Sequence, residues 1–495
     1  MTIRDFPSCG NTGQAFQWSG AMNERVRWEK DFLGKLPLPE DAYYGIQSLR
    51  ASLNFPISGL RNPESMLKAV VIIKKAAALT NKKLKRLDAS IAEGIIEACD
   101  EILEGGLREQ FIVDAFQMGA GTAFHMNCNE VIANRAAEIR GGRKGDYEKV
   151  HPNDHVNMGQ STNDVFPTAM RLALLSLVRD ECQPALEEME DAFRRKAVEF
   201  EDVVKSGRTH LQDAVPIRLG QEFKAYAETL SRGRAFLAHS AASLLALGIG
   251  GSAVGTGLNT SEEYAASMVS ELASLTRFPL EKAEDLREAM QSMRPLTEVA
   301  AALRNLAVEL NRIANDLRLL ASGPKTGLSE IVLPAVAPGS SAMPGKVNPS
   351  MLEMLNMVCY QIIGCDLAVT GAAQAGQLEL NVMMPVIIFN LDFMIRILSN
   401  ALKEVKKRCI EGIKADAERC RLYAEKSIAL VTVLSPSIGY QKSADLFKKV
   451  LSSGKTLREI IESEGLLTEK EMKIFYDRRR MTEPGILFHP KRKKK

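Results

Sequence analysis

Long stretches of the chain repeat apolar residues three and four positions apart, the period of an amphipathic α-helix. The clearest runs from Val299 to Leu320, where the apolar residues are spaced 4-3-4-3-4-3 over 22 residues. A second seam covers 182–204, and Pro184 within it is expected to kink the helix or to begin a new one. Near-heptad spacing is typical of long helices that pack at shallow angles, so we expect a helical bundle.

Shorter amphipathic helices are predicted over 66–81 and 91–103, and 351–394 reads as apolar helix interrupted near 371–376. Patterns typical of strands are few, so the chain is predicted to be mainly α. These helices present more apolar face than one chain can easily cover, which favours a bundle completed by other subunits. The expected divisions are an N-terminal extension, a mostly helical domain, a central long-helix bundle, and a small helical domain with a basic tail: 1–26, 27–160, 161–415 and 416–495.

Composition narrows the class of protein. The chain has 495 residues, 45% hydrophobic and 25% charged, with a net charge of +3, which is too small to indicate a nucleic-acid or membrane partner. The basic run 491–495 is interpreted as a solvated tail. Eight cysteines without a C-x-x-C pair or a His/Cys cluster predict buried reduced thiols, with no metal and no disulfide framework. The first 26 residues lack a signal peptide, so a cytoplasmic protein is expected.

Four polar segments interrupt the helical pattern. The most distinctive is 339–349, Gly-Ser-Ser-Ala-Met-Pro-Gly-Lys-Val-Asn-Pro, whose glycines and prolines exclude a helix or strand interior. The others are 119–127, 151–164 and 207–213. Each gathers hydroxyl and amide groups that can hold a small, strongly solvated ligand. Such residues before a helix are more often N-caps, as Asp164 could be, but four segments together favour a binding site.

The 339–349 segment resembles the signature loop of the fumarase/aspartase superfamily, and the other segments agree in order and spacing. The resemblance extends from about residue 27 to 484. Within the superfamily it is most similar to the aspartate ammonia-lyases, on DAYYG at 41–45, QSTND at 160–164, LRLLASGPKTGLSEI at 317–331 and QAGQLELNV at 374–382. Class II fumarase is the near alternative, because it shares the loop and a GRTHxQD segment. The third reading is a catalytically silent structural protein on the same scaffold.

The resemblance implies a homotetramer whose active sites combine loops from three subunits. It implies no cofactor, and a small dicarboxylate, aspartate or fumarate with ammonia, as the substrate. By matched position the catalytic residues are Ser340 as general base and His210, oriented by Glu353. The remaining matched residues bind substrate: Thr122, Ser161, Thr162 and Ser341 around one carboxylate, Lys346, Asn348 and Thr209 around the other, and Asn163 near the leaving group.

Eliminating ammonia requires removal of a weakly acidic Cβ proton, which becomes feasible if the adjacent carboxylate takes the charge as an aci-carboxylate. Preorganised donors must meet that charge, as in an oxyanion hole. A serine acts as base only in a closed, dry loop near a cation and N–H dipoles. Ala123 and His125 depart from the family pattern, which has serine and asparagine there. These two positions bear on substrate choice more than on the reaction class.

Overall fold

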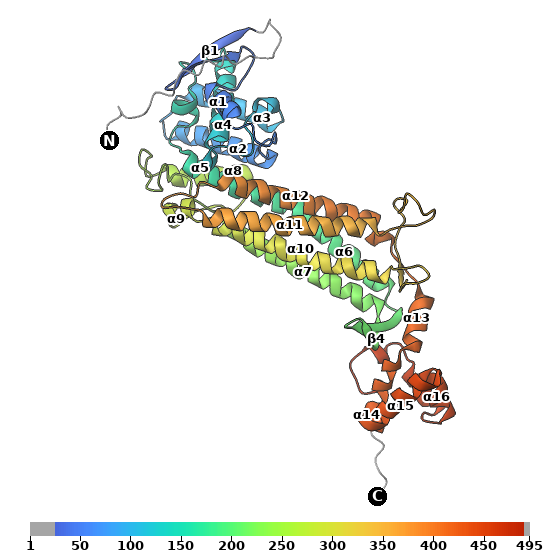
Figure 1. Ribbon diagram of the computed structural model, residues 1–495. Helices are drawn as coiled ribbons and strands as arrows, with labels where there is room; N and C mark the ends of the chain where they lie inside the picture. The colour runs from blue at the N-terminus through green and yellow to red at the C-terminus, as the bar shows by residue number, and fades with distance from the viewer. Residues whose placement is uncertain (1–24, 490–495) are drawn as a thin grey trace.

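The computed structural model describes residues 25–489. Almost all of the predicted N-terminal extension, and the basic run 491–495, therefore lie outside the described residues. The molecule is elongated, with a long helical bundle in the middle and a smaller, mostly helical region at each end (Figure 1).

The bundle is built from five long rods. The first rod consists of two helices joined in direct succession by a π-helical turn. The rods are α5 (Thr162–Leu177) with the turn Val178–Cys182 and α6 (Gln183–Glu199), then α7 (Leu219–Ala242), α10 (Arg294–Leu320), α11 (Ser350–Gln374) and α12 (Met384–Arg408). α10 packs on α7 and α11, α11 packs on α12, and α6 packs on α7 and α12. The near-heptad seam of α10 faces this interior, since Val299, Leu303 and Leu306 are buried.

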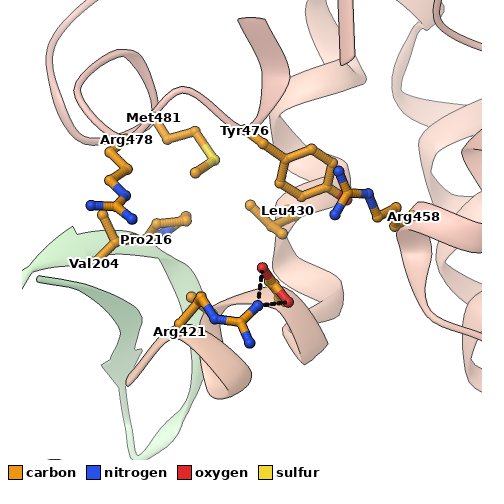
Figure 2. Close-up of a pocket in the computed structure, with 10 residues that line it drawn as sticks. Val204, Pro216, Arg421, Leu430, Arg458, Tyr476, Arg478 and Met481 are labelled. Atoms are coloured by element: carbon orange, nitrogen blue, oxygen red, sulfur yellow. Dashed lines mark hydrogen bonds and ion pairs between the residues drawn. The ribbon is translucent and has the colours of Figure 1, made fainter. Parts of the chain in front are cut away.

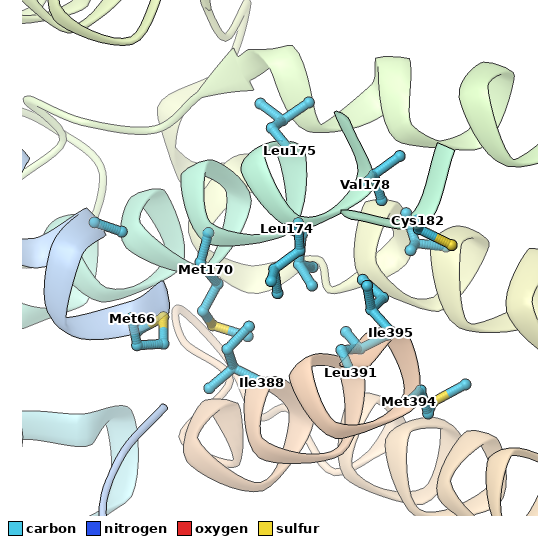
Figure 3. Close-up of a cluster of buried hydrophobic side chains, with 14 of the residues drawn as sticks. Met66, Met170, Leu174, Leu175, Val178, Cys182, Ile388, Leu391, Met394 and Ile395 are labelled. Carbon is cyan, nitrogen blue, oxygen red and sulfur yellow. The ribbon is translucent and has the colours of Figure 1, made fainter. Parts of the chain in front are cut away.

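The N-terminal region carries a two-stranded hairpin and four helices: β1 (Val26–Asp31), β2 (Gly34–Pro39), α1 (Ile46–Asn54), α2 (Glu64–Lys83), α3 (Ala89–Leu103) and α4 (Thr122–Ile139). α2 also packs against α5 of the bundle and against α8 (Tyr264–Thr276). One continuous hydrophobic core joins this region to the bundle. Figure 3 shows part of it, where Leu174 of α5 faces Leu391 and Ile395 of α12.

The opposite end of the bundle carries the antiparallel hairpin of β3 (Val204–Thr209) and β4 (Gln212–Arg218). Beyond it lie the C-terminal helices α13 (Ala417–Lys426), α14 (Ser435–Ile438), α15 (Tyr440–Ser453), α16 (Leu457–Ser463) and α17 (Glu469–Phe475). These helices enclose a second, separate core around Ile461 and Phe475. The bundle and the C-terminal region thus have their own interiors, while the expected boundaries between domains stay a prediction.

The structure confirms the mainly α architecture and most of the predicted helices. It also confirms the interruption near 371–376, because α11 ends at Gln374 and α12 begins at Met384. Pro184 lies in the first turn of α6, directly after the π-helical turn. The second seam was predicted too long: the helix ends at Glu199, and Val204 begins a strand, because the polar run 201–202 breaks the apolar repeat. All cysteines among residues 25–489 are buried and free, as predicted.

α11 and the segment Met384–Gly412 are long and apolar enough to cross a membrane by length and composition alone. In the second, 67% of the most apolar stretch is buried inside the bundle, against 39% in α11. The apolar side chains that α11 leaves exposed include Met357, Tyr360 and Leu367, the last of them 73% exposed. A single chain therefore leaves an apolar strip along α11 uncovered.

Candidate active site

The first group of predicted site residues lies where two helices begin side by side. Thr122 is the first residue of α4, Ser161 is the N-cap of α5, and Thr162 and Asn163 open α5. We call these four residues the hydroxyl pole. Nδ1 of His125, on the first turn of α4, lies 2.7 Å from Oγ1 of Thr162, so the two helix ends are in contact. Helix N-termini present free N–H groups and partial positive charge, which suits an anion.

A glycine and a buried carboxylate fix this pole. Gly121, the N-cap of α4, has φ +79°, and a Cβ there would lie 2.1 Å from the ring of Phe166. The Asp164 carboxylate completes a capping box with Ser161 and also accepts two backbone N–H bonds, each 3.0 Å, from Gly250 and from Ser252. Burial raises the pKa of Asp164 to about 6. The glycine-rich segment around Gly250 thus packs against the pole and is held by it.

A buried lysine stands behind the pole. Nζ of Lys74, on α2, lies 2.6 Å from Nε2 of His125 and donates to side-chain oxygens of Asn157 and Gln160 at 2.9 and 2.8 Å. Lys74 is fully buried and His125 is 1% exposed. The chain of contacts runs from Lys74 through His125 to Thr162. His125 stands out in the sequence as a departure from the family pattern, whereas Lys74 belongs to no motif. Its signal is a lysine inside the apolar face of the helix predicted over 66–81.

The second group lies on the loop that precedes α11. Ser340, Ser341, Lys346 and Asn348 belong to this loop, and we call these four residues the loop pole. Its neck is closed because Gly339 N donates to Lys346 O at 2.7 Å and Asn348 Nδ2 donates to Gly339 O at 2.7 Å. Asn348 therefore ties the loop, in addition to its expected contact with substrate. The Lys346 side chain makes no hydrogen bond or ion pair to any residue within 25–489, which leaves its ammonium available.

Ser340 occupies a special position in the loop pole. Its Oγ accepts backbone N–H bonds from Ala342 at 3.2 Å and from Met343 at 2.9 Å. Donors of this kind stabilise an oxygen that carries negative charge. Glu353 lies one turn into α11, half-buried, and within residues 25–489 of one chain it makes no hydrogen bond or ion pair with His210.

Thr209 and His210 lie at the tip of the β3–β4 hairpin. The two-residue turn between the strands consists of His210 and Leu211, with φ 55° and 59°. Such turns favour Asn-Gly, because positive φ costs other residues of the order of 1–2 kcal/mol each. The strained turn holds His210 and Leu211 exposed, Leu211 by 71%. Strain of this kind points to a functional position.

A buried ion cluster ties this hairpin to Glu330, which precedes the loop pole in the chain. The Glu330 carboxylate is 0% exposed and lies 2.8 Å from Arg208 Nη1 and 3.2 Å from Lys205 Nζ. Lys205 also pairs with Glu222 at 2.8 Å, and burial raises the pKa of Glu222 above its usual value. No sequence pattern groups these residues, because Glu330 lies over a hundred residues beyond Lys205, Arg208 and Glu222 in the chain.

The two poles lie at opposite ends of the bundle (Figure 1). Thr162 begins and Glu199 ends a nearly continuous helical rod of 38 residues, about 57 Å long at about 1.5 Å per residue. The hairpin follows directly after this rod. One chain therefore brings together Thr122, Ser161, Thr162 and Asn163, but not these with Ser340, Lys346, Thr209 or His210.

A cavity of about 200 Å³ lies away from both poles, between the hairpin and the C-terminal helices. Arg421, Arg458 and Arg478 approach it from different sides, with Tyr476 between them (Figure 2). Arg421 is already paired with Glu425. No predicted site residue lines this cavity, so it is distinct from the candidate active site.

The long-helix bundle, the signature loop and the hydroxyl-lined helix ends define a lyase, and the chain belongs to the fumarase/aspartase superfamily of lyases. The Lyase family model matches residues 34–364, and the model of the Fumarase C C-terminus matches 430–483.

Curated relatives carry a more particular name. The chain is 49% identical to an aspartate ammonia-lyase of Bacillus subtilis, over 94% of this chain and 97% of that protein. It is 45% identical to that of Escherichia coli, over 94% and 98%. Among solved structures, a fumarate lyase:delta crystallin from Brucella melitensis matches with TM-score 0.90 and 49% identity, covering 93% of this chain and all of that one. A class II fumarase from Schistosoma mansoni matches with TM-score 0.88 and 37% identity, covering 92% and 98%.

Proposed function

We propose that this chain is an aspartate ammonia-lyase, which reversibly eliminates ammonia from L-aspartate to give fumarate. The relatives of that name are 45–49% identical over 94% of the chain, against 37% for the class II fumarase. The cytoplasmic location expected from the sequence belongs to the same proposal.

The observation that supports the mechanism is the environment of Ser340. Its Oγ already accepts two backbone N–H bonds on an exposed loop that also carries Lys346. When the loop closes over substrate and excludes water, these dipoles and the ammonium lower the cost of the alkoxide. Ser340 then takes the Cβ proton as general base.

The hydroxyl pole supplies the complementary half of the chemistry. Loss of the Cβ proton puts a second negative charge on the adjacent carboxylate, as an aci-carboxylate. Thr122, Ser161 and Thr162, with the first N–H groups of α4 and α5, face that charge as preorganised donors. Lys346, Asn348 and Thr209 hold the other carboxylate, while Asn163 and His210 lie near the departing ammonia.

These roles need chains to combine, so the proposal includes a homotetramer with sites shared among three subunits. Two observations support it. The poles lie at opposite ends of the bundle, whose α5–α6 rod is about 57 Å long, and α11 exposes Met357, Tyr360 and Leu367 along one strip. Covering that strip with helices of neighbouring chains also brings loops of one chain towards helix ends of another.

Fumarate formation, followed by its ultraviolet absorbance, tests the activity with aspartate and separately with malate. Turnover of aspartate is expected. Turnover of malate alone would identify a fumarase, and turnover of neither would favour the structural reading. Ser340→Ala should abolish turnover and leave the oligomer intact, with Ser452→Ala as an exposed control serine. Near wild-type activity of Ser340→Ala would remove Ser340 from its role.

Mixing two inactive variants tests the shared site. Thr162→Val damages only the hydroxyl pole and Ser340→Ala only the loop pole. If each site takes its poles from different chains, one-to-one mixed tetramers contain both intact poles in roughly a quarter of their sites. Activity should therefore return to about that fraction of wild type on mixing. No recovery in verified mixed tetramers would mean that both poles come from one chain, against the proposal.

A further inference from the structure

We propose that Lys74 and His125 are positioning residues that set the direction of the Thr162 hydroxyl proton. In one state of this chain Thr162 can donate to the substrate carboxylate, and in the other it cannot. The inference deepens the proposed function, on which it rests for the role of Thr162.

The amide groups around Lys74 fix what its nitrogen must do. The side-chain nitrogen of Asn157 (Nδ2) donates to the backbone carbonyl of Gln160 at 3.3 Å. The side-chain nitrogen of Gln160 (Nε2) donates to the backbone carbonyls of Val156 and Met158 at 3.1 and 3.3 Å. Both amide nitrogens are therefore committed, and both amide oxygens face Lys74. Because those oxygens can only accept, Lys74 must donate to both of them.

The charged lysine has one proton left. An ammonium carries three, so the third is donated to Nε2 of His125 across 2.6 Å. A neutral imidazole with an acceptor at Nε2 carries its proton on Nδ1. That proton is donated to Oγ1 of Thr162 across 2.7 Å. The hydroxyl proton of Thr162 is then free to point at the substrate.

The neutral lysine reverses the bond from Lys74 to His125 and the bond from His125 to Thr162, without moving a heavy atom. Its two protons still go to Asn157 and Gln160, and its lone pair accepts Nε2–H from His125. Nδ1 of His125 then accepts the hydroxyl proton of Thr162, which turns away from the site. One proton lost at Lys74 thus removes one carboxylate donor from the hydroxyl pole.

The surroundings place both states within reach. Burial lowers the pKa of Lys74 to about 7. Burial and then the charge of Lys74 hold the pKa of His125 well below its usual range, so the ring stays neutral. The other ionisable groups acting on Lys74 are Cys128 on α4, Asp164 on α5 and Cys99 on α3. Burial raises the pKa of both thiols, so they stay uncharged, while ionised Asp164 favours the ammonium.

The sign of the pH dependence follows. Lys74 is protonated below its pKa, so Thr162 donates there and ceases to donate as pH rises through it. A bound dicarboxylate adds negative charge nearby and moves the transition upward. A purely structural role for the cluster would hold the helices together equally in both states and would leave the tautomer of His125 unchanged.

The tautomer can be read directly by ¹⁵N NMR of protein labelled at its six histidines, with the His125→Asn variant identifying the resonance of His125. We expect the Nδ1–H tautomer at low pH and Nε2–H at high pH, with a midpoint near 7 in the free protein and a higher one with fumarate bound. A single tautomer across this range would overturn the switch. This readout does not depend on turnover, so it separates failure of the switch from failure of the proposed activity.

A double-mutant cycle tests the link to Thr162. Removal of one such donor costs on the order of 10²–10³ in rate, so Lys74→Gln and Thr162→Val should each lower kcat/KM by about that factor. The double variant should lose little more, because both changes remove one donor. Lys75→Gln is the matched control, since the neighbouring Lys75 pairs with Asp100 on α3 and takes no part in the hydrogen bonds from Lys74 through His125 to Thr162. Losses that multiply in the double variant would overturn the proposal.

Discussion

Replacing Glu330 by glutamine should loosen the β3–β4 hairpin far more than its small change in shape suggests. The carboxylate is 0% exposed and is the acidic partner that Arg208 and Lys205 share. Removing one member of a buried ion cluster costs about 3–5 kcal/mol, because the remaining charges stay buried without compensation. Lys205 keeps Glu222 at 2.8 Å, so we expect the lower end, about 3 kcal/mol.

Hydrogen exchange of a peptide covering 204–218 measures this cost locally. A loss of about 3 kcal/mol raises the population of the open hairpin roughly a hundredfold, since about 1.4 kcal/mol corresponds to a factor of ten. The same variant should lower kcat, because Thr209 and His210 lie at the tip of the loosened hairpin. Glu404→Gln is the control: its ion pair with Arg408 is exposed on α12, and such pairs contribute little. Equal exchange in the two variants would refute the assigned role of the Glu330 cluster.

Three further substitutions test other parts of the scaffold. Gly121→Ala should destabilise the protein by about 3 kcal/mol, seen as a lower urea midpoint, because the new methyl group meets Phe166 at a residue with φ +79°. Leu211→Asn should slow exchange in the hairpin severalfold, because asparagine tolerates φ 59° better than leucine; faster exchange would deny the strain. Leu367→Glu should reduce the oligomer in light scattering, whereas Leu451→Glu, an equally exposed apolar site on α15, should not.

Much of the fold could be predicted from local patterns, because a helix with one buried face requires apolar residues at the helical period. The α10 seam and the breaks near 371–376 follow directly from that rule. The hairpins were harder. Pro37 lies within β2, and the turn between β1 and β2 carries exposed Phe32 and Leu33, where polar or glycine residues are the usual signal. The β3–β4 turn uses His210 and Leu211 where the usual signal is Asn-Gly.

The candidate site divides in the same way. Motifs indicate the residues of the two poles, because short hydroxyl- and glycine-rich segments can be recognised in the sequence without knowledge of the fold. Lys74 belongs to no motif: Lys74 and Lys75 are adjacent in the sequence, and only the helical period of α2 separates the buried lysine from the one paired at the surface. The role of Glu330 could not be predicted from the sequence either, because its partner Arg208 lies 122 residues away.

The separation of the poles allows the proposed charge-stabilising donors to be rigid and the loop with the proposed base to be mobile. Donors for developing charge act best when they need no reorganisation, and Thr122 and Thr162 begin helices inside the main core. The proposed base needs the opposite, since Ser340 must be covered only when substrate is present, and its loop is exposed and closed only at a narrow neck. A single element could not be both rigid and mobile. Placing the halves at opposite ends of the bundle lets each keep its own stability, and the proposed site is then complete only in the proposed oligomer. On this proposal, the apolar strip on α11 is as much a condition of catalysis as any residue that touches the substrate.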